Sequence, residues 1–296
     1  MQHTHNGADT GQKMSLQDLI EQVNKSDIGS LRQNVVRILS LVHNPATSAH
    51  ELSDLIQTDP PLCSRILRVA NSAFYGSQRH VGAIRQAIIW LGFNTVKELA
   101  LSQKVFELFQ NGNGLADFSL KNLWNHSMLV AVGSKLVYRR EFVLSGEEAF
   151  TAGLLHELGL IIEAQFCKEV FAYDLIHQHK GNMRQLEDAI LGYNHCDIGG
   201  ALAKAWEFPD FISSSIKYHH TPELSPERGR RLVQTVFIAD TLATRIYKEF
   251  NDEPAENKAT FDACMRDLSI ESEALDLLAK ELEKERQILV EKGLML

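Results

Sequence analysis

Several ionisable residues of one helical unit occupy positions where the helical period calls for buried side chains. Burying such groups without partners costs so much free energy that they must pair with one another or hold a metal ion. Neutral imidazoles together with carboxylates form a ligand set that suits divalent iron, manganese, zinc or nickel. The candidate metal ligands are His126, His156, Glu157, His195, His219, His220 and Asp240.

The placement of these residues on apolar faces is clearest in three segments. His126 shares a helical face with Leu123, and Asp240 shares one with Val236. His156 and Glu157 interrupt the apolar run 149–162. Any one of these histidines, taken alone, is more often a buried imidazole hydrogen-bonded to a carbonyl than a metal ligand. Asp240, taken alone, is more often a buried carboxylate paired with an arginine. The occurrence of all seven in one helical unit favours a metal site.

The apolar pattern predicts an all-α fold, because apolar residues recur with the helical period and strand-like alternation between hairpin turns is absent. Three start signals support this prediction: a capping box at Ser48 with Glu51, an N-cap at Asp59 before Pro60, and a cap at Thr95. We expect helices at 31–42, 49–57, 60–70, 84–91, 95–109, 120–140, 147–165, 168–179, 183–191, 195–206, 209–218 and 227–250.

The chain divides into four predicted parts. Residues 1–27 form an N-terminal tail and first helix, 28–112 an N-terminal helical subdomain, 113–250 a second helical subdomain, and 251–296 a C-terminal helical extension. The boundary between the subdomains rests on segment 110–118, which carries glycines between asparagines. Segment 269–292 alternates acidic and basic residues around a leucine stripe, which is typical of a surface helix.

The composition is that of a folded protein that does not bind nucleic acid. Its 296 residues are 44% hydrophobic, and the net charge of −8 provides no positive field for a phosphate backbone. No apolar run approaches the ~18 residues of a membrane span, so no membrane partner is expected. The four cysteines are far apart and form no metal-binding pair. These features predict a cytoplasmic protein.

The order of the ionisable residues resembles the HD superfamily, whose members are helical metal-dependent phosphohydrolases and whose HD-GYP branch has a similarly long histidine series. Four segments in the first half narrow this resemblance to the HDOD family, the HD-related output domains of bacteria. The segments are 31–39, 52–60, 67–76 and 84–88, and the third contains the most specific element, Ala-Asn-Ser-Ala-Phe-Tyr-Gly at 70–76. The resemblance covers about 28–222, and Asp240 lies beyond it.

The resemblance to the HDOD family implies an N-terminal helical subdomain packed on a degenerate HD-like helical subdomain. It also implies a regulatory module that acts through contacts with signalling or regulatory proteins, since most members have no demonstrated catalysis. The superfamily pattern implies that His126, His156, Glu157 and Asp240 bind one divalent ion. It implies that His195, His219 and His220 hold a second ion or a phosphate.

Three departures from active members of the superfamily argue against catalysis. Glu157 stands where active members carry Asp, and its extra methylene moves the carboxylate by about 1.5 Å. Leu160 follows Gly159 where active HD-GYP enzymes carry Lys, and the Gly-Tyr-Pro signature after His220 is missing. We therefore expect a pocket that binds a metal or an anion without turnover and serves as a structural or sensory element. The alternative is a metal-dependent phosphohydrolase that acts on a nucleotide or phosphodiester through an activated water.

Overall fold

The computed structural model describes residues 13–75, 80–110, 120–170, 183–247 and 258–295, and these residues form helices and no strands. The predicted all-α fold is therefore confirmed. The first helices are α1 (Leu16–Lys25), α2 (Asp27–His43), α3 (Ala49–Gln57), α4 (Pro60–Ala70), the 3-10 turn η1 (Ala73–Tyr75), α5 (Ile84–Leu91) and α6 (Phe93–Gln110). None of the described helices is long and apolar enough to cross a membrane.

The second half of the chain contains the helices that carry the candidate ligands. They are α7 (Leu120–Glu141), α8 (Glu147–Leu155), α9 (Leu158–Phe166), α11 (Met183–Ile190), α12 (His195–Ala205), α13 (Asp210–Tyr218), the 3-10 turn η2 (Pro222–Leu224), α14 (Arg230–Ile246), α15 (Lys258–Asp267) and α16 (Ser272–Glu291).

Two of the three predicted start signals work as expected. The Ser48 hydroxyl accepts a hydrogen bond from the Glu51 backbone while the Glu51 carboxylate accepts one from the Ser48 backbone, and this reciprocal pair opens α3. Asp59 caps α4 through the backbone N–H of Leu62. The cap at Thr95 is wrong, because α6 already begins at Phe93. Gly92 has a φ of +89°, which ends α5 and lets the next helix start at once.

The predicted helix over 147–165 is also wrong, since the chain breaks there into α8 and α9 at His156 and Glu157. In the C-terminal extension, α15 precedes α16, the helix expected over 269–292. The helix expected at 168–179 extends into residues outside the described part of the chain. Most of the tail and of segment 110–118 also lies outside it, so the boundary between subdomains stays a prediction.

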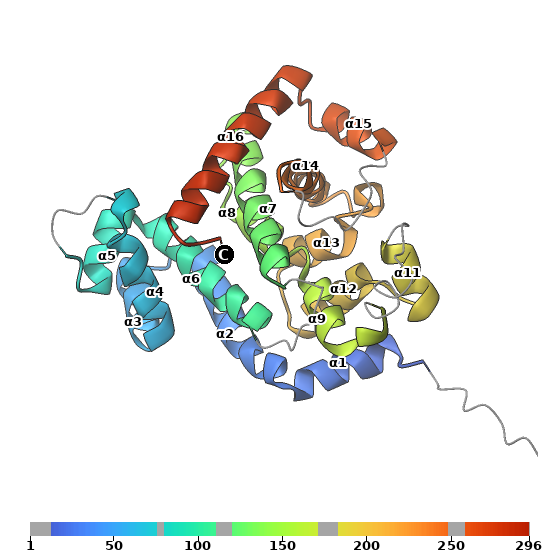
Figure 1. The fold of residues 1–296 in the computed structure, drawn as a ribbon, viewed down its shortest axis with the longest axis horizontal. Helices are drawn as coiled ribbons and strands as arrows, with labels where there is room; N and C mark the ends of the chain where they lie inside the picture. The colour runs from blue at the N-terminus through green and yellow to red at the C-terminus, as the bar shows by residue number, and fades with distance from the viewer. Residues whose placement is uncertain (1–12, 76–79, 111–119, 171–182, 248–257, 296) are drawn as a thin grey trace, which may run out of the picture.

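The candidate ligands lie in the half of the molecule built around α7 (Figure 1). Helix α7 packs against α8, α14 and α16, while α9, α12 and α13 pack together beside them. Helices α2 to α6 form a bundle on the other side of α7, and α1 extends from α2 to contact α9 and α12. The first helix therefore connects the two halves.

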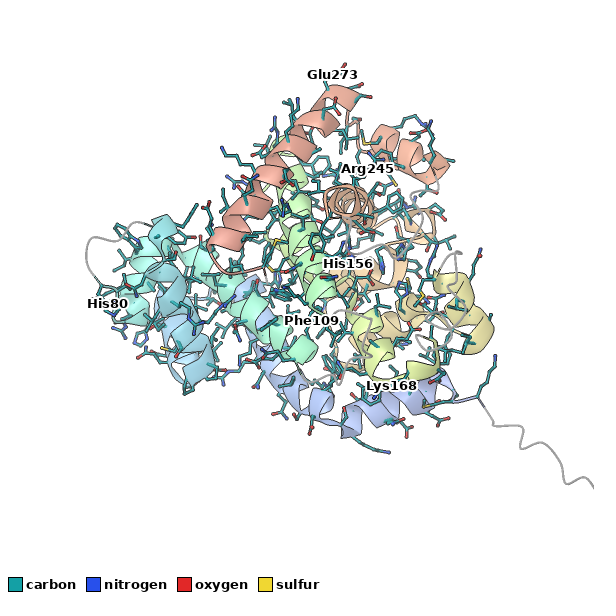
Figure 2. The ribbon with its side chains drawn as sticks, in the orientation of Figure 1. His80, Phe109, His156, Lys168, Arg245 and Glu273 are labelled. Carbon is teal, nitrogen blue, oxygen red and sulfur yellow. The ribbon has the colours of Figure 1, made fainter. Side chains whose placement is uncertain are left out.

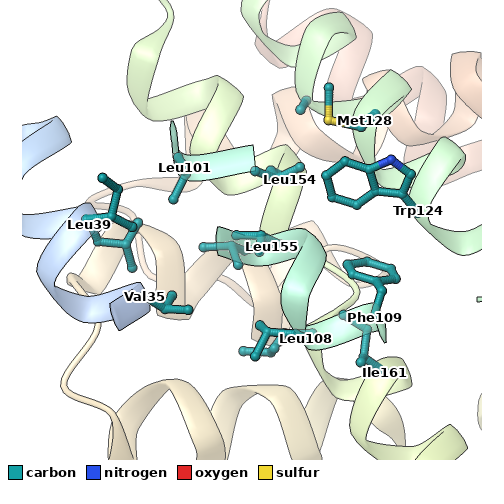
Figure 3. Packing of buried hydrophobic residues seen from close by; sticks show 14 of the residues in the cluster. Val35, Leu39, Leu101, Leu108, Phe109, Trp124, Met128, Leu154, Leu155 and Ile161 are labelled. Atoms are coloured by element: carbon teal, nitrogen blue, oxygen red, sulfur yellow. The ribbon is translucent and has the colours of Figure 1, made fainter. Parts of the chain in front are cut away.

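One hydrophobic cluster crosses from the N-terminal bundle into the second half of the molecule. Leu101 of α6 lies near Leu154 of α8, and Phe109 of α6 meets the ring of Trp124 of α7 edge-on at 5.3 Å (Figure 3). A second cluster fills the space between α7, α14, α15 and α16. Because α7 and α8 belong to both clusters, the position of the candidate ligands on them is fixed from two sides.

His43, the last residue of α2, ties the N-terminal bundle to α8. Its Nε2 lies 3.0 Å from the hydroxyl oxygen of Thr151, and its ring meets Phe211 edge-on at 5.2 Å. Burial lowers the pKa of His43 from 6.5 to about 4, the charge of Lys97 adds to this effect, and Glu147 opposes it. The folded protein therefore favours the neutral imidazole.

We expect His43 to make the protein less stable in mild acid. Between pH 6.5 and about 4 the unfolded chain binds a proton that the folded chain does not, so the free energy of unfolding falls as the pH falls through this window. In His43→Gln the loss of stability between about pH 7 and pH 5, measured by urea unfolding, should be smaller than in the unchanged protein. The exposed His80 provides the control, because His80→Gln should leave this loss unchanged. An equal pH dependence of the free energy of unfolding in all three proteins would contradict this role of His43.

Candidate metal centre

The structure brings the seven candidate ligands together at one place inside the second half of the molecule, where Figure 2 labels His156 among the surrounding helices. His126 comes from α7, His156 and Glu157 from the break between α8 and α9, and His195 is the first residue of α12. His219 and His220 follow α13, and Asp240 belongs to α14. We call these seven residues the donor cluster. That they bind a metal ion stays a prediction.

The imidazoles of the donor cluster form a continuous chain of contacts. The ring centroids are 5.5 Å apart for His126 and His156, 5.1 Å for His156 and His219, and 4.1 Å for His219 and His220. His195 lies 5.6 Å from His219 and 5.2 Å from His220. Several imidazoles in such close contact are typical of a metal site.

Two histidines are held with an unprotonated nitrogen facing the centre of the cluster. The Nδ1 of His156 lies 2.7 Å from the Gly153 carbonyl oxygen, and that of His219 lies 2.8 Å from the Ile216 carbonyl oxygen. A carbonyl only accepts hydrogen bonds, so Nδ1 carries the proton and Nε2 keeps its lone pair. Burial lowers the pKa of His156 to about 3 and, together with the neighbouring imidazoles, lowers that of His219 well below its usual value. Both rings are therefore neutral and suited to bind a cation.

Glu157 lies between the Nε2 atoms of three histidines. Its carboxylate oxygens are 3.8 Å from Nε2 of His156, 3.8 Å from Nε2 of His195 and 3.9 Å from Nε2 of His219. These distances are too long for hydrogen bonds. These oxygen-to-nitrogen distances match those between two ligands of one metal ion. Two metal–ligand bonds of about 2.1 Å place their donor atoms up to about 4.2 Å apart.

The buried lone pairs of His156 and His219 support the same interpretation. Among the described residues, neither Nε2 atom has a hydrogen-bond donor within reach, and both face a carboxylate. A buried imidazole lone pair that faces a carboxylate oxygen costs free energy, because both atoms are hydrogen-bond acceptors, unless a cation lies between them. The donor set therefore fits a divalent ion between Glu157 and the histidines that face its carboxylate.

His126 and Asp240 form the other end of the cluster. The Nε2 atom of His126 lies 2.9 Å from Oδ1 of Asp240, and the donor atoms of His126, His156 and Glu157 lie within 4.8 Å of one another. Burial alone would raise the pKa of Asp240, but the adjacent His126 outweighs it and lowers the pKa to about 2. The carboxylate is therefore ionised and adds negative charge next to the candidate ligands.

Sequence reasoning missed Glu187, which orients His195. Both carboxylate oxygens of Glu187 lie 2.9 Å from Nδ1 of His195, and one also accepts the His195 backbone N–H. A carboxylate on the far nitrogen fixes the tautomer of a ligand histidine and strengthens its binding nitrogen. Glu187 is fully buried in the short α11. Its leucine neighbour does not set it apart in the sequence, because the exposed Glu51 also lies beside a leucine.

Replacing Glu187 with Gln should weaken metal binding by about 10- to 100-fold, because His195 loses the charge that orients it. The neighbouring Asp188 is exposed and contacts Asn194 instead, so Asp188→Asn is the matched control and should keep the affinity of the unchanged protein. Competition with a fluorescent chelator measures both affinities. Equal affinities for Glu187→Gln and the control would exclude this role.

Three glycines that sequence reasoning did not select bring the ligand-bearing helices together. A Cβ on Gly153 would lie 2.8 Å from the Val130 carbonyl oxygen, so α8 touches the backbone of α7. A Cβ on Gly159 would overlap the carbonyl oxygen of His195, and one on Gly199 would lie 2.5 Å from the side chain of Ile216. These contacts place α9 against α12 and α12 against α13.

The break between α8 and α9 has a physical reason in this packing. In a continuous helix His156 and Glu157 would point about 100° apart. Glu157 instead adopts φ −92° and ψ +21°, which bends the chain so that α9 can lie against α12 at Gly159. Both side chains then reach the same centre.

Comparison with known proteins identifies the family. The profile of the HDOD domain matches residues 28–222. An uncharacterised protein of Treponema pallidum (strain Nichols) is 25% identical over 219 residues, which are 72% of this chain and 42% of that protein. The chain thus spans less than half the length of this curated relative.

Solved structures agree with this assignment. An HDOD domain protein from Geobacter sulfurreducens is 27% identical and has a TM-score of 0.75, covering 94% of this chain and 96% of that one. A proposed signal transduction protein from Marinobacter aquaeolei VT8 has the same fold at 21% identity and a TM-score of 0.74, covering 95% of this chain and 65% of that one. A proposed phosphohydrolase from Shewanella amazonensis SB2B has it at 23% identity and a TM-score of 0.70, covering 95% of this chain and 96% of that one. This chain therefore belongs to the HDOD family.

Proposed function

We propose that the chain is a non-catalytic, cytoplasmic regulatory module that signals through contacts with other proteins and keeps a divalent metal ion as an internal cross-link. The observation that carries this proposal is the burial of the donor cluster. His126, His156, Glu157, His195 and His219 are each at most 1% exposed. The partners that the family suggests are signalling or regulatory proteins.

Burial of this kind suits a structural ion better than a catalytic one. A catalytic ion needs an open coordination position and a cleft through which substrate arrives. Here three imidazoles surround the Glu157 carboxylate, and Glu157 is only 1% exposed. An ion bound there would join α9, α12 and α13 through ligands that are far apart in the sequence.

Leu160 adds a second argument against catalysis. It stands where the resemblance expects a lysine in active HD-GYP enzymes, and it is 1% exposed within the hydrophobic cluster that extends into α12 and α13. A lysine there would be buried at high cost, so introducing this cation is expected to destabilise the protein rather than restore a phosphate contact. The local packing therefore matches a non-catalytic role.

The alternative function is hydrolysis of a nucleotide or phosphodiester, and one observation favours it. The donors also form a second group, in which ligand atoms of His195, Cys196, His219 and His220 lie within 4.8 Å of one another. Together with the group around His126, this is enough for two ions, as two-metal hydrolases require. His220 and Asp240 are only half-buried and mark the side from which a substrate would approach.

An activity assay on the full chain distinguishes the two functions. The protein is loaded separately with iron, manganese, zinc or nickel and incubated with bis(p-nitrophenyl) phosphate and a panel of nucleotides. We expect no turnover above that of the free ions. Metal-dependent hydrolysis that disappears in His156→Gln and persists in His80→Gln would establish the enzyme instead.

A further inference from the structure

A pocket of about 190 Å³ lies on the other side of α7 from the donor cluster, between α6, α7, α8 and α16. None of the seven cluster residues lines it. Its lining is mixed: apolar side chains, among them Leu99, Met128, Val132, Phe150 and Leu289, lie beside polar and charged ones. Tyr75 of η1 completes the wall from the N-terminal bundle.

The end of the chain closes this pocket. The indole N–H of Trp124 donates to the Leu294 carbonyl oxygen at 2.9 Å, and Arg65 of α4 donates to the Gly293 carbonyl oxygen. Leu294 and Met295 are buried in the main hydrophobic cluster, and Figure 1 shows the end of α16 beside α6 and α7. These contacts lie outside the 28–222 span of the family profile. The pocket is thus completed by a segment that the family profile does not include.

Three cationic side chains and two carboxylates, Glu98 and Glu285, line the pocket, so positive charge is in slight excess. Lys135 is paired with Glu98, and the Lys292 ammonium lies 4.4 Å from the centre of the Phe74 ring and 5.1 Å from that of Tyr75. Arg139 also borders the pocket, where its charge helps to counter the rise in the pKa of Glu98 that burial causes. An arginine at the edge of a partly apolar pocket is suited to bind a carboxylate through two parallel hydrogen bonds.

We propose that this pocket binds a small aromatic carboxylic acid, with its ring against Met128 and Phe150 and its carboxylate on Arg139. The size fits, because an apolar cavity of about 150 Å³ is enough to hold benzene. Ring-to-ring and sulfur-to-ring contacts favour an aromatic body over an aliphatic chain. A ligand here touches α7, α8 and the C-terminal helix at once, so binding stabilises their packing. The inference is independent of the metal.

The test uses benzoate as the probe, with its neutral isostere benzamide for comparison. Isothermal titration calorimetry of the full chain should show saturable binding of benzoate. The affinity for benzamide should be at least about tenfold lower, because benzamide lacks the negative charge of the carboxylate. The substitution Arg139→Gln should lower the affinity for benzoate by a similar factor. Arg140, the next residue on α7, pairs with Glu281 of α16 and does not line the pocket, so Arg140→Gln is the matched control and should keep benzoate affinity.

A second variant keeps the test decisive if Arg139→Gln does not fold. Val132→Phe places a ring inside the pocket and should abolish binding of both probes while the protein stays folded by circular dichroism. Absence of saturable benzoate binding to the unchanged protein would overturn the proposal. So would equal affinity for benzoate and benzamide, or unchanged binding to Val132→Phe.

Discussion

Gly159→Ala is expected to destabilise the protein by more than about 3 kcal/mol, at or beyond the upper end of ordinary overpacking effects. The added Cβ would overlap the carbonyl oxygen of His195, which is backbone and cannot rotate away. Helix propensity acts in the opposite direction, because alanine is better than glycine inside a helix by about 1 kcal/mol. The steric term dominates, so α9 must move away from α12.

Gly82→Ala is the matched control for this variant, because a Cβ at Gly82 meets no atom within 4 Å. Urea unfolding should show a large shift for Gly159→Ala and little change for the control. Metal affinity should fall in Gly159→Ala as well, since the same movement separates Glu157 from His195. A Gly159→Ala protein as stable as the control would mean that the two helices do not pack as closely as described.

Removal of the metal is expected to have the second large effect. An ion that binds the folded chain alone stabilises it by about 4 kcal/mol when its concentration is a thousand times the dissociation constant. Chelation should therefore lower the melting temperature of the unchanged protein by several degrees. The reason is local: without a cation, the lone pairs of His156 and His219 face the carboxylate of Glu157 in a buried site.

His219→Gln isolates this contribution, because glutamine is polar but lacks the imidazole nitrogen that faces Glu157. The variant should melt at the same temperature with and without chelator. The control His80→Gln changes an exposed histidine and should lose as much stability on chelation as the unchanged protein. Equal sensitivity of His219→Gln and His80→Gln to the chelator would contradict a stabilising ion at this site.

The helices themselves were largely predictable because their signals are local. The caps at Ser48 and Asp59 involve residues within three positions of one another, so the sequence alone determines them. The break at His156 and Glu157 was not predictable in this way. No proline marks it, and it follows from the contact of α9 with α12 at Gly159, which forms only in the folded protein.

The donor cluster was predicted in part. Ionisable residues on apolar faces, together with the superfamily order, selected the seven side chains that the structure brings together. The role of Glu187 could not be predicted, because a glutamate in a short polar segment resembles a solvated residue. Only the fold reveals its contact with His195. The close contact at Gly159 could not be predicted for a similar reason. A glycine within an apolar run does not show which backbone segment will pack against it.

Elemental analysis of the purified full chain tests the central claim most directly. The protein is incubated with iron, manganese, zinc or nickel, dialysed, and its metal content is measured per chain, with His219→Gln and His80→Gln treated in parallel. We predict that the unchanged protein and His80→Gln retain at least one divalent ion per chain and that His219→Gln loses it. An unchanged protein that retains none of these ions, or a His219→Gln variant that retains as much as the unchanged protein, would contradict the claim.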